Sequence, residues 1–193
     1  RNNISENLHD DIGASLSNIG ILTELAKRNL GNEQKSTEYL NKAGEDIQRI
    51  SESISDIVWN INPKYDELTN LFVRMKRYAA DMLDGKNISY QLNFSEEAEA
   101  MSLSMEKRRN FYLIFKEAIN NLVKYSQASQ AIVEVNLDHQ HLKLFIKDDG
   151  KGFDATAKSS GNGLHNMQKR AQDMNGLFRI ESVPGKGTSV TLD

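Results

Sequence analysis

A histidine and an aspartate stand next to each other near the start of the chain, at His9 and Asp10. A carboxylate beside an imidazole can keep one ring nitrogen protonated and leave the other free to act as a nucleophile. If this segment is helical, with about 100° of rotation per residue, His9 lies on the flank of the surrounding apolar stripe, where solvent or another domain can reach it. Taken alone, an exposed surface histidine beside two acids is the simpler explanation.

Three polar residues share one side of a helix that the sequence predicts over residues 104–126. Glu117 and Asn121 are four positions apart and therefore lie on one face, with Lys124 one turn beyond. An amide oxygen suits a Mg²⁺ ion that already has phosphate ligands, and a lysine can contact a phosphate. An ordinary amphipathic helix with a polar flank is the alternative. The inward positions of this segment are predicted at Ala118, Leu122 and Tyr125.

An aspartate and two glycines follow an alternating strand pattern, at Asp148, Gly150 and Gly152. A buried carboxylate at the end of a strand can accept a hydrogen bond from an amino group of a ligand. The glycines allow the backbone to approach a ligand closely. Because Asp-Gly is also a common turn signal, a simple hairpin turn explains the same residues.

Two more glycine-containing segments stand near the C-terminus. Gly161 and Gly163 precede an expected helix, whose unpaired first N–H groups can bind a phosphate. Thr188 follows a Gly-Lys-Gly sequence and enters the last expected strand. Each of these two segments, taken alone, is an ordinary loop or turn.

The composition excludes several classes of protein. Of 193 residues, 38% are apolar and 26% are charged, which is typical of globular proteins rather than disordered or fibrous ones. There is no cysteine, so disulfides, iron–sulfur clusters and thiolate nucleophiles are excluded. A net charge of −3 argues against direct nucleic-acid binding through bulk charge. The longest apolar run, residues 111–115, is far shorter than the ~20 residues of a membrane helix.

The elements that must position these residues fall into two parts, 1–62 and 63–193, with a boundary at Asn62-Pro63. In the first part, apolar residues recur every three or four positions, which predicts one helix over 3–30 and a second that Ser36 or Thr37 caps and that runs to residue 61. A lone antiparallel hairpin leaves apolar residues uncovered, so we expect two copies to form a dimeric four-helix bundle. The second helix carries a heptad seam at Leu40, Ala43, Ile47, Ile50, Ile54, Ile57 and Ile61.

The second part predicts helices packed on one face of a sheet, an α/β sandwich, and the whole chain is therefore assigned to the α+β class. Residues 151–162 are rich in glycine, serine and lysine, and we expect a mobile loop there. The chain begins inside an expected helix, which suggests a fragment of a longer protein. The expected helices are 66–84, 104–126 and 163–174, and the expected strands are 88–94, 130–137, 142–148, 176–183 and 188–192.

The order and spacing of the motifs resemble a known family. An E-A-x-x-N helix, a strand ending in D-x-G-x-G, a loop, a G-x-G-L helix start and a G-T pair before the last strand are similar to the ATP-binding domain of the GHKL superfamily, which has the Bergerat fold. The H-D-x-x-G motif on a helical hairpin narrows the resemblance to sensor histidine kinases. The aspartate directly after the histidine, together with residues 56–63, resembles the subfamily that pairs with LuxR/NarL-type response regulators.

The resemblance implies ATP and Mg²⁺ as cofactors and gives the motif residues their roles. His9 would accept the phosphoryl group, and Asp10 would orient the His9 imidazole and remove its proton. Glu117 would lie near the metal and its waters. The other implied site residues are Asn121 for Mg²⁺, Lys124 for the phosphates, Asp148 for the adenine amino group, Gly150 and Gly152 for the pocket, Gly161 and Gly163 for the lid and phosphates, and Thr188 for support of Asp148 or an ordered water.

The resemblance also implies partners and a location. A homodimer would pass the phosphoryl group from His9 to an aspartate of a response regulator, with residues 151–162 as lid and Asn62-Pro63 as hinge. The fragment would be cytoplasmic, and segments upstream would anchor the protein in the bacterial inner membrane.

Two positions depart from the family pattern. Tyr125 replaces a frequent histidine, and Ala14 replaces the Gln or His that orients water in strong phosphatases, so weak phosphatase activity is predicted.

Two other functions compete with this interpretation. A GHKL ATPase that uses hydrolysis to drive a conformational change would release phosphate steadily and form no phosphoprotein, with Glu117 activating water. The His-Asp pair on a heptad hairpin argues against it. A dimeric interaction module with an inactive nucleotide pocket would not bind ATP. The complete set of Asn121, Asp148 and the glycines argues against that module.

Overall fold

A computed structural model gives the arrangement of the chain. It describes residues 2–61, 68–154 and 163–193, and within the first two helices the side chains of residues 2–11, 48–49, 52–53 and 55–61 lie outside the description. The contacts group into two compact units, Arg1–Asn62 and Pro63–Asp193. None of the described helices combines the length and the apolar character that a membrane crossing requires.

The first unit is a helical hairpin of α1 (Asn2–Arg28) and α2 (Glu33–Ile61). Lys27 and Arg28 lie in the last turn of α1, where positive charge interacts favourably with the helix dipole. The cap of α2 differs from the prediction, because the side chain of Asn32 accepts a hydrogen bond from the Lys35 amide at 3.1 Å. Ser36 lies inside the helix instead, and its hydroxyl donates to the Ala26 carbonyl across the hairpin.

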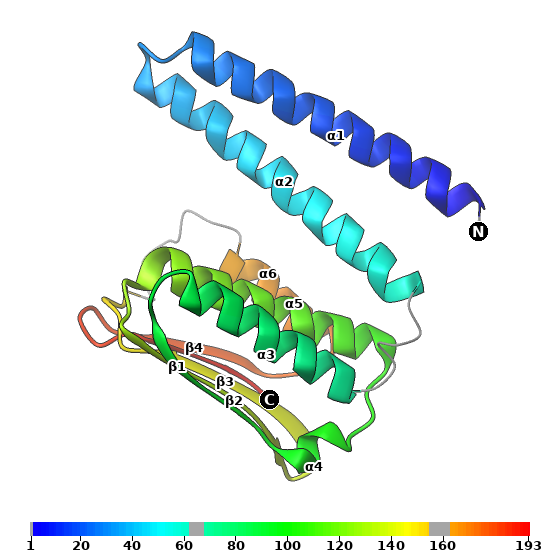
Figure 1. The fold of residues 1–193 in the computed structure, drawn as a ribbon, viewed down its shortest axis with the longest axis vertical. Coiled ribbons are helices and arrows are strands. Elements are labelled where there is room, and N and C mark those ends of the chain that lie inside the picture. The colour runs from blue at the N-terminus through cyan, green and yellow to red at the C-terminus, as the bar shows by residue number, and fades with distance from the viewer. Residues whose placement is uncertain (1, 62–67, 155–162) are drawn as a thin grey trace. The chain divides into compact units, whose positions relative to one another are not determined.

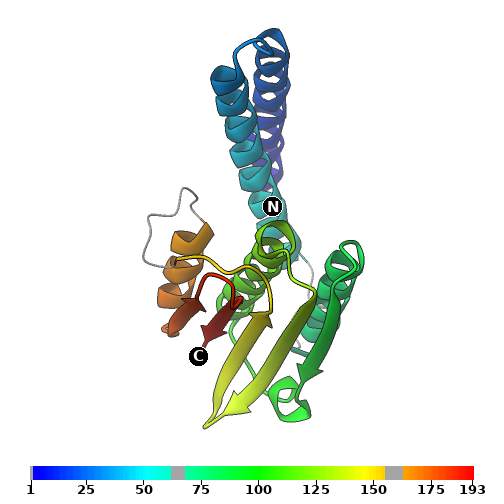
Figure 2. The same ribbon diagram turned by 90° about the vertical axis from the view of Figure 1, so that its left-hand side faces the viewer.

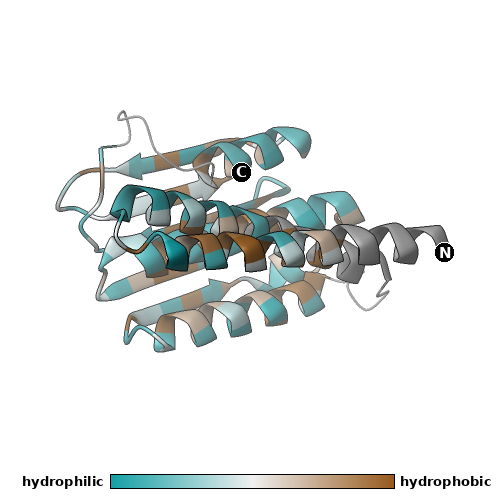
Figure 3. Cartoon of the chain, turned by 90° about the horizontal axis from the view of Figure 1, so that it is seen from above, coloured by the Kyte–Doolittle hydropathy of each residue, from teal (hydrophilic) through white to brown (hydrophobic). Residues whose placement is uncertain are grey.

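The apolar residues of the hairpin divide into two sets. Leu22, Ala26 and Ala43 are buried between the two helices. The other set stays exposed: on α2 it recurs every seven residues, at Leu40, Ile47 and Ile54, and on α1 it includes Leu16 and Ile21. Figure 3 shows hydrophobic segments along α1 among hydrophilic ones. The single seam predicted from the sequence therefore contains positions that face the neighbouring helix and positions that the hairpin leaves uncovered.

The second unit is a five-stranded sheet covered on one face by helices (Figures 1 and 2). The strand order is β1-β2-β3-β5-β4, with β1 and β2 parallel and all other neighbours antiparallel. The elements are α3 (Leu68–Asp84), β1 (Ser89–Phe94), α4 (Glu96–Glu99), α5 (Met105–Asn121), the π-helix η2 (Leu122–Ser126), β2 (Gln130–Asp138), β3 (His141–Asp148), α6 (Gly163–Asp173), β4 (Phe178–Ser182) and β5 (Thr188–Leu192).

The core of the second unit lies between the sheet and the helices. Alternate residues of β2 and β3 point toward it, because neighbouring side chains of a strand face opposite sides of a sheet. The helix α5 contributes the large buried residues Phe111, Ile114 and Phe115. The α+β class is thus confirmed, with a helical N-terminal part followed by a sheet domain.

The structure corrects the predicted elements at three places. The helix expected over 104–126 ends at Asn121 and continues as the π-helix η2, after which Gln127 adopts a left-handed φ of 56°. The short helix α4, capped by the Ser95 hydroxyl, was not predicted. The strand expected over 176–183 is limited to Phe178–Ser182. Of the loop expected over 151–162, residues 155–162 lie outside the described part of the chain.

Candidate functional site

The end of α5 meets the start of α6. A side-chain carbon placed on Gly163, the first residue of α6, would overlap the carboxylate oxygen Oε1 of Glu117 and would lie 3.7 Å from Nδ2 of Asn121. The two residues thus share a face, as predicted, and that face is directed at Gly163. Asn120 points elsewhere, because its Oδ1 accepts a hydrogen bond from the Tyr78 hydroxyl on α3 at 2.6 Å. The fold therefore brings a carboxylate and an amide to the N-terminus of an eleven-residue helix.

The π-helix changes which residues of this segment face inward. In a π-helix the hydrogen bonds run from residue i to i+5, so each turn is wider than in an α-helix. The inward position after Leu122 falls on Ser126, which is buried, and not on Tyr125, which is 63% exposed. The predicted inward role of Tyr125 is wrong for this reason. Lys124 is also exposed.

Asp148, the last residue of β3, is a buried carboxylate, 5% exposed. Its Oδ1 accepts a hydrogen bond from the Gly150 amide at 2.8 Å, and the Thr188 amide on β5 also donates to the carboxylate. Burial raises the pKa of Asp148, while these two amides oppose the rise. The group is held in a fixed orientation by the backbone of the turn after β3 and by that of β5, which suits an acceptor for a ligand's N–H.

Gly150 permits a close approach between two loops. A side chain there would overlap the carbonyl oxygen of Ser126, at the end of η2. The Lys151 amide donates to the same carbonyl at 2.7 Å. The turn that carries Asp148 therefore lies directly against the segment that leaves η2.

On its other side, the same turn is attached to the loop between β4 and β5. The Ser182 hydroxyl accepts a hydrogen bond from the Phe153 amide at 2.9 Å and donates to the Gly187 carbonyl at 3.1 Å. The Thr188 hydroxyl lies 2.9 Å from the Ser182 hydroxyl. Thr188 therefore supports Asp148 through its backbone amide, while its side chain contacts Ser182.

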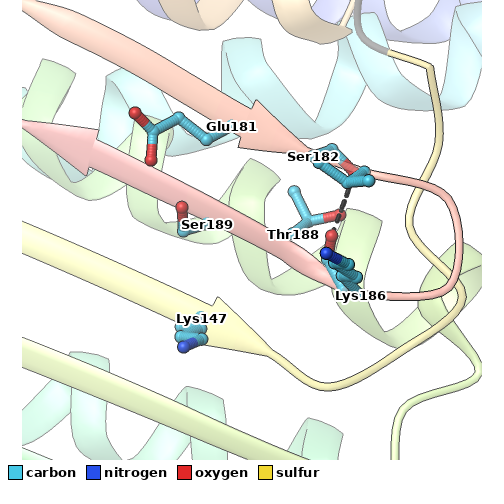
Figure 4. Close-up of a pocket in the computed structure, with 8 residues that line it drawn as sticks. Lys147, Glu181, Ser182, Lys186, Thr188 and Ser189 are labelled. Carbon is cyan, nitrogen blue, oxygen red and sulfur yellow. Dashed lines mark hydrogen bonds between the residues drawn. The ribbon is translucent and has the colours of Figure 1, made fainter.

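A shallow hollow lies at this end of the sheet (Figure 4). Lys147, Ser189 and Glu181 form a cross-strand row along one side of it. Neighbouring residues of a strand face opposite sides of the sheet, so this row lies on the side away from Asp148. Of the predicted site residues that the structure describes, Thr188 alone lines this hollow. The hollow thus adjoins the Asp148 group through Thr188, while its cross-strand row lies on the opposite face of the sheet.

A substitution at Gly187 tests whether the β4–β5 loop requires a residue without a side chain at this position. Gly187→Ala is expected to lower the free energy of unfolding of the second unit by about 2–4 kcal/mol. Its φ is 79°, and an added Cβ would overlap the Asp148 carbonyl oxygen. Gly185 is the matched control, because its φ is 78° but nothing lies within 4 Å of an added Cβ. Measured by urea unfolding, Gly185→Ala should lower the free energy of unfolding by only about 1 kcal/mol. Equal losses for the two variants would contradict the predicted overlap of the Gly187 Cβ with the Asp148 carbonyl.

The structure brings the predicted site residues into two groups within the second unit. Glu117 and Asn121 meet Gly163, and Asp148 meets Gly150 and Thr188. Gly152 has a φ of 58° and lies against the Val183 carbonyl, so it shapes the turn after Asp148. Gly161 lies outside the described residues. His9 and Asp10 are in α1, and their side chains are likewise outside the description.

The chemistry of these groups fits a nucleotide with a divalent cation. A buried carboxylate can accept a hydrogen bond from a base amino group, and the N-terminus of α6 can bind phosphate. The described residues contain no cluster of three or more His, Cys, Asp or Glu that would hold a metal by itself. A carboxylate and an amide oxygen leave most positions of a Mg²⁺ ion to water and phosphate, which is its usual coordination.

Comparison with known proteins assigns a family to both units. Residues 1–66 match the family model described as histidine kinase. Residues 106–193 match the model described as histidine kinase-, DNA gyrase B- and HSP90-like ATPase. The chain belongs to the histidine kinase family. The second unit of this kinase is accordingly an ATP-binding domain of the GHKL type.

Individual relatives agree with this assignment. The signal transduction histidine-protein kinase/phosphatase UhpB of Salmonella typhimurium is 29% identical over 202 aligned positions, which include the whole chain and 38% of UhpB. The histidine kinase domain of a blue-light activated kinase from Erythrobacter litoralis EL346 has a TM-score of 0.59 at 13% identity, covering 92% of this chain and 94% of that one. Acinetobacter baumannii histidine kinase AdeS has a TM-score of 0.58 at 16% identity, covering 91% and 93%. The two solved structures share the fold with this kinase.

Two residues that shape the site of this kinase were not found from the sequence. Ser182 joins the turn after Asp148 to the β4–β5 loop, and nothing in its sequence context distinguishes it from other strand serines. Asp149 accepts three hydrogen bonds from Ser129 and Gln130. The Asp-Asp-Gly sequence contains a signal for Asp149, since aspartate commonly accepts backbone N–H groups in turns.

Proposed function

We propose that residues 63–193 hold Mg-ATP and that residues 1–62 carry the phosphoacceptor, so that the chain phosphorylates itself on His9. The observation that carries the ATP site is the junction of Glu117 and Asn121 with the N-terminus of α6. Asp148 would accept from the adenine amino group, and Asn121 and Lys124 would face the metal and the phosphates. Glu117 would bind the waters of Mg²⁺. That ion, when bound, offsets the negative charge of the phosphates.

The proposed reaction has two steps. A neutral imidazole nitrogen of His9 attacks the γ-phosphorus, the bond to the bridging oxygen of ADP breaks, and Asp10 takes the imidazole proton. In the second step a carboxylate oxygen of a response regulator attacks the phosphorus, the nitrogen–phosphorus bond breaks, and the proton held by Asp10 returns to the imidazole. An imidazole with an unperturbed pKa of about 6.5 is largely neutral at pH 7, which suits the first step. Because His9 and the ATP site are on different units, the segment around Asn62-Pro63 would act as the hinge.

We propose a homodimer as the working form. Leu40, Ile47 and Ile54 are 51%, 55% and 44% exposed in the single hairpin and recur at heptad spacing. A stripe of this spacing is typical of a helix that packs against another helix, and a second copy of the hairpin supplies one. The regulator is proposed to be of the LuxR/NarL type, which the resemblance of residues 8–13 and 56–63 supports.

Weak phosphatase activity is part of the proposal. Ala14 is exposed on α1 and has a methyl side chain, which cannot orient an attacking water. The relative from Salmonella typhimurium is named as a kinase and a phosphatase, and those activities are its own. For this chain we propose that transfer to the regulator is faster than removal of phosphate from it.

A single labelling experiment tests the function. The chain is incubated with Mg²⁺ and ATP labelled at the γ-phosphate, and a purified LuxR/NarL-type regulator is then added. We expect a label on the chain that is lost in acid and kept in alkali, as a phosphoramidate is, followed by a long-lived label on the regulator. Steady phosphate release with no labelled protein would favour the ATPase alternative. An acid-stable label would point to Ser, Thr or Tyr, and rapid loss from the regulator would contradict weak phosphatase activity.

A further inference from the structure

Asp149 is a surface residue whose carboxylate is fully engaged by one short segment of chain. Its Oδ1 accepts from the amides of Ser129 and Gln130, both at 2.8 Å, and its Oδ2 accepts from the Ser129 hydroxyl at 2.7 Å. Its own amide donates to the Gln130 carbonyl at 3.2 Å. The Gln130 amide, and after it the Ser129 hydroxyl, lower the pKa of Asp149, so the group is ionised at neutral pH.

The segment that Asp149 binds leads directly back to the phosphate side of the proposed ATP site. Residues 127–129 join η2 to β2, and Gln127 makes a sharp turn there with its left-handed φ. On the far side of Asp149, the Lys151 amide donates to the Ser126 carbonyl, and Gly150 lies against the same carbonyl. The turn 148–151 and the segment 126–130 are therefore fastened to each other at both ends.

This fastening lies between two parts of the proposed site. On one side stand Asn121 and Lys124, at the end of α5 and in η2. On the other side stands Asp148, one residue before Asp149. Asp149 does not face the same way as Asp148, since one is exposed and the other buried. It can therefore act on a ligand through the backbone that it holds.

We propose that Asp149 is a positioning residue, which sets the distance between the adenine end and the phosphate end of the ATP site. This inference rests on the proposed roles of Asp148, Asn121 and Lys124. Asp149 contacts no part of the nucleotide. Without its carboxylate, the amides of Ser129 and Gln130 and the Ser129 hydroxyl lose their acceptor. Only backbone hydrogen bonds such as those from the Lys151 and Asp149 amides then hold the segment to the turn, so the end of η2 is fixed less firmly relative to Asp148. A ligand that uses both ends of the site then binds less tightly, whereas a ligand that uses only the adenine end does not.

The test compares ATP with adenosine on the whole chain. Calorimetry gives the affinity for ATP in Mg²⁺, and an NMR shift titration gives the affinity for adenosine. Asp149→Ala is expected to weaken ATP binding about tenfold and to leave adenosine binding within about twofold. Asp149→Asn keeps an oxygen for the two amides and can donate to the Ser129 hydroxyl, so it should restore ATP binding to within about threefold of the wild type.

Controls separate positioning from loss of structure. Asp138, an exposed acid at the other end of the same strand pair, is the matched site, and Asp138→Ala should bind both ligands as the wild type does. Ser129→Ala removes only the hydroxyl donor and should weaken ATP about twofold to threefold. It serves as the test if Asp149→Ala does not fold.

The possible outcomes are distinct. Unchanged ATP binding in Asp149→Ala, an equal loss for ATP and adenosine, or no recovery in Asp149→Asn would each overturn the positioning role. If Asp149→Ala does not fold, unchanged ATP binding in Ser129→Ala would overturn it as well. Failure of the wild-type chain to bind ATP would instead overturn the proposed function.

Discussion

His9→Gln is expected to abolish labelling of the chain by γ-labelled ATP while ATP binding stays within about twofold of the wild type. Glutamine keeps a polar side chain of similar length on the helix but has no nucleophilic ring nitrogen to form the phosphoramidate. The ATP site is proposed to lie in the other compact unit, to which residue 9 does not belong. Labelling after a fixed time and calorimetric titration with Mg-ATP measure the two quantities on the same preparation.

The chain supplies its own control for this substitution. His139 is a described histidine in the turn between β2 and β3, with a side chain that is 95% exposed. His139→Gln should label at the wild-type rate. A label that persists in His9→Gln would show that another residue accepts the phosphoryl group. Loss of both label and ATP binding would mean that residue 9 supports the second unit, which the proposed division of labour does not allow.

Periodicity was sufficient to predict most elements from the sequence, since each has its own hydrophobic pattern. The limits of α3 and β3 fall within a few residues of the structure because glycine, proline or a polar turn ends each pattern. The end of α5 could not be found in this way. Its helical pattern continues smoothly through Tyr125, and the π-turn shows itself only when burial distinguishes Ser126 from Tyr125.

For another reason, the sequence alone could not show which heptad residues are buried in the hairpin and which stay exposed. Spacings of three and four identify residues that leave solvent, but not which neighbour covers each of them. Ala43 packs inside the hairpin, and Leu40 and Ile47, three and four residues away from it, remain exposed. In the same way, the buried Asp46 looks like a surface acid in sequence, yet it accepts a hydrogen bond from Asn18 on the other helix at 2.6 Å.

The candidate site was predictable where its residues are close in sequence. Glu117 with Asn121, and Asp148 with Gly150, follow from helix and turn geometry. The contacts that join distant segments could not be derived from spacing. Ser182 and Phe153 are separated by 29 positions, and Asp149 and Ser129 by 20. Such contacts depend on the strand order, in which β5 lies between β3 and β4 and brings the last loop beside the turn after Asp148.

The burial of Asp148 gives the second large effect, which separates function from stability. Asp148→Asn is expected to weaken ATP binding by about 10- to 100-fold, because a hydrogen bond to a charged acceptor contributes about 1.5–3 kcal/mol. The same variant should be at least as stable as the wild type at pH 7 without nucleotide. This combination is expected where a residue binds a ligand at a cost in stability. If Asp148 were purely structural, its substitution would lower both stability and ATP binding.

The sign of the stability change follows from the raised pKa of Asp148, whose main cause is burial. Folding then favours the protonated carboxyl, so this group's contribution to stability is present below the ordinary pKa of 3.8 and is lost as pH rises through the raised folded value. At pH 7 the ionised group is a net cost that a neutral asparagine removes, and below pH 3.8 the difference between the two proteins should disappear. Thermal unfolding from pH 3 to 8, with Asp138→Asn as the exposed control, measures this difference in stability between Asp148→Asn and the wild type. If Asp148→Asn melts well below the wild type at pH 7, Asp148 stabilises the fold. A loss of ATP binding in that variant would then no longer be evidence that Asp148 contacts the adenine.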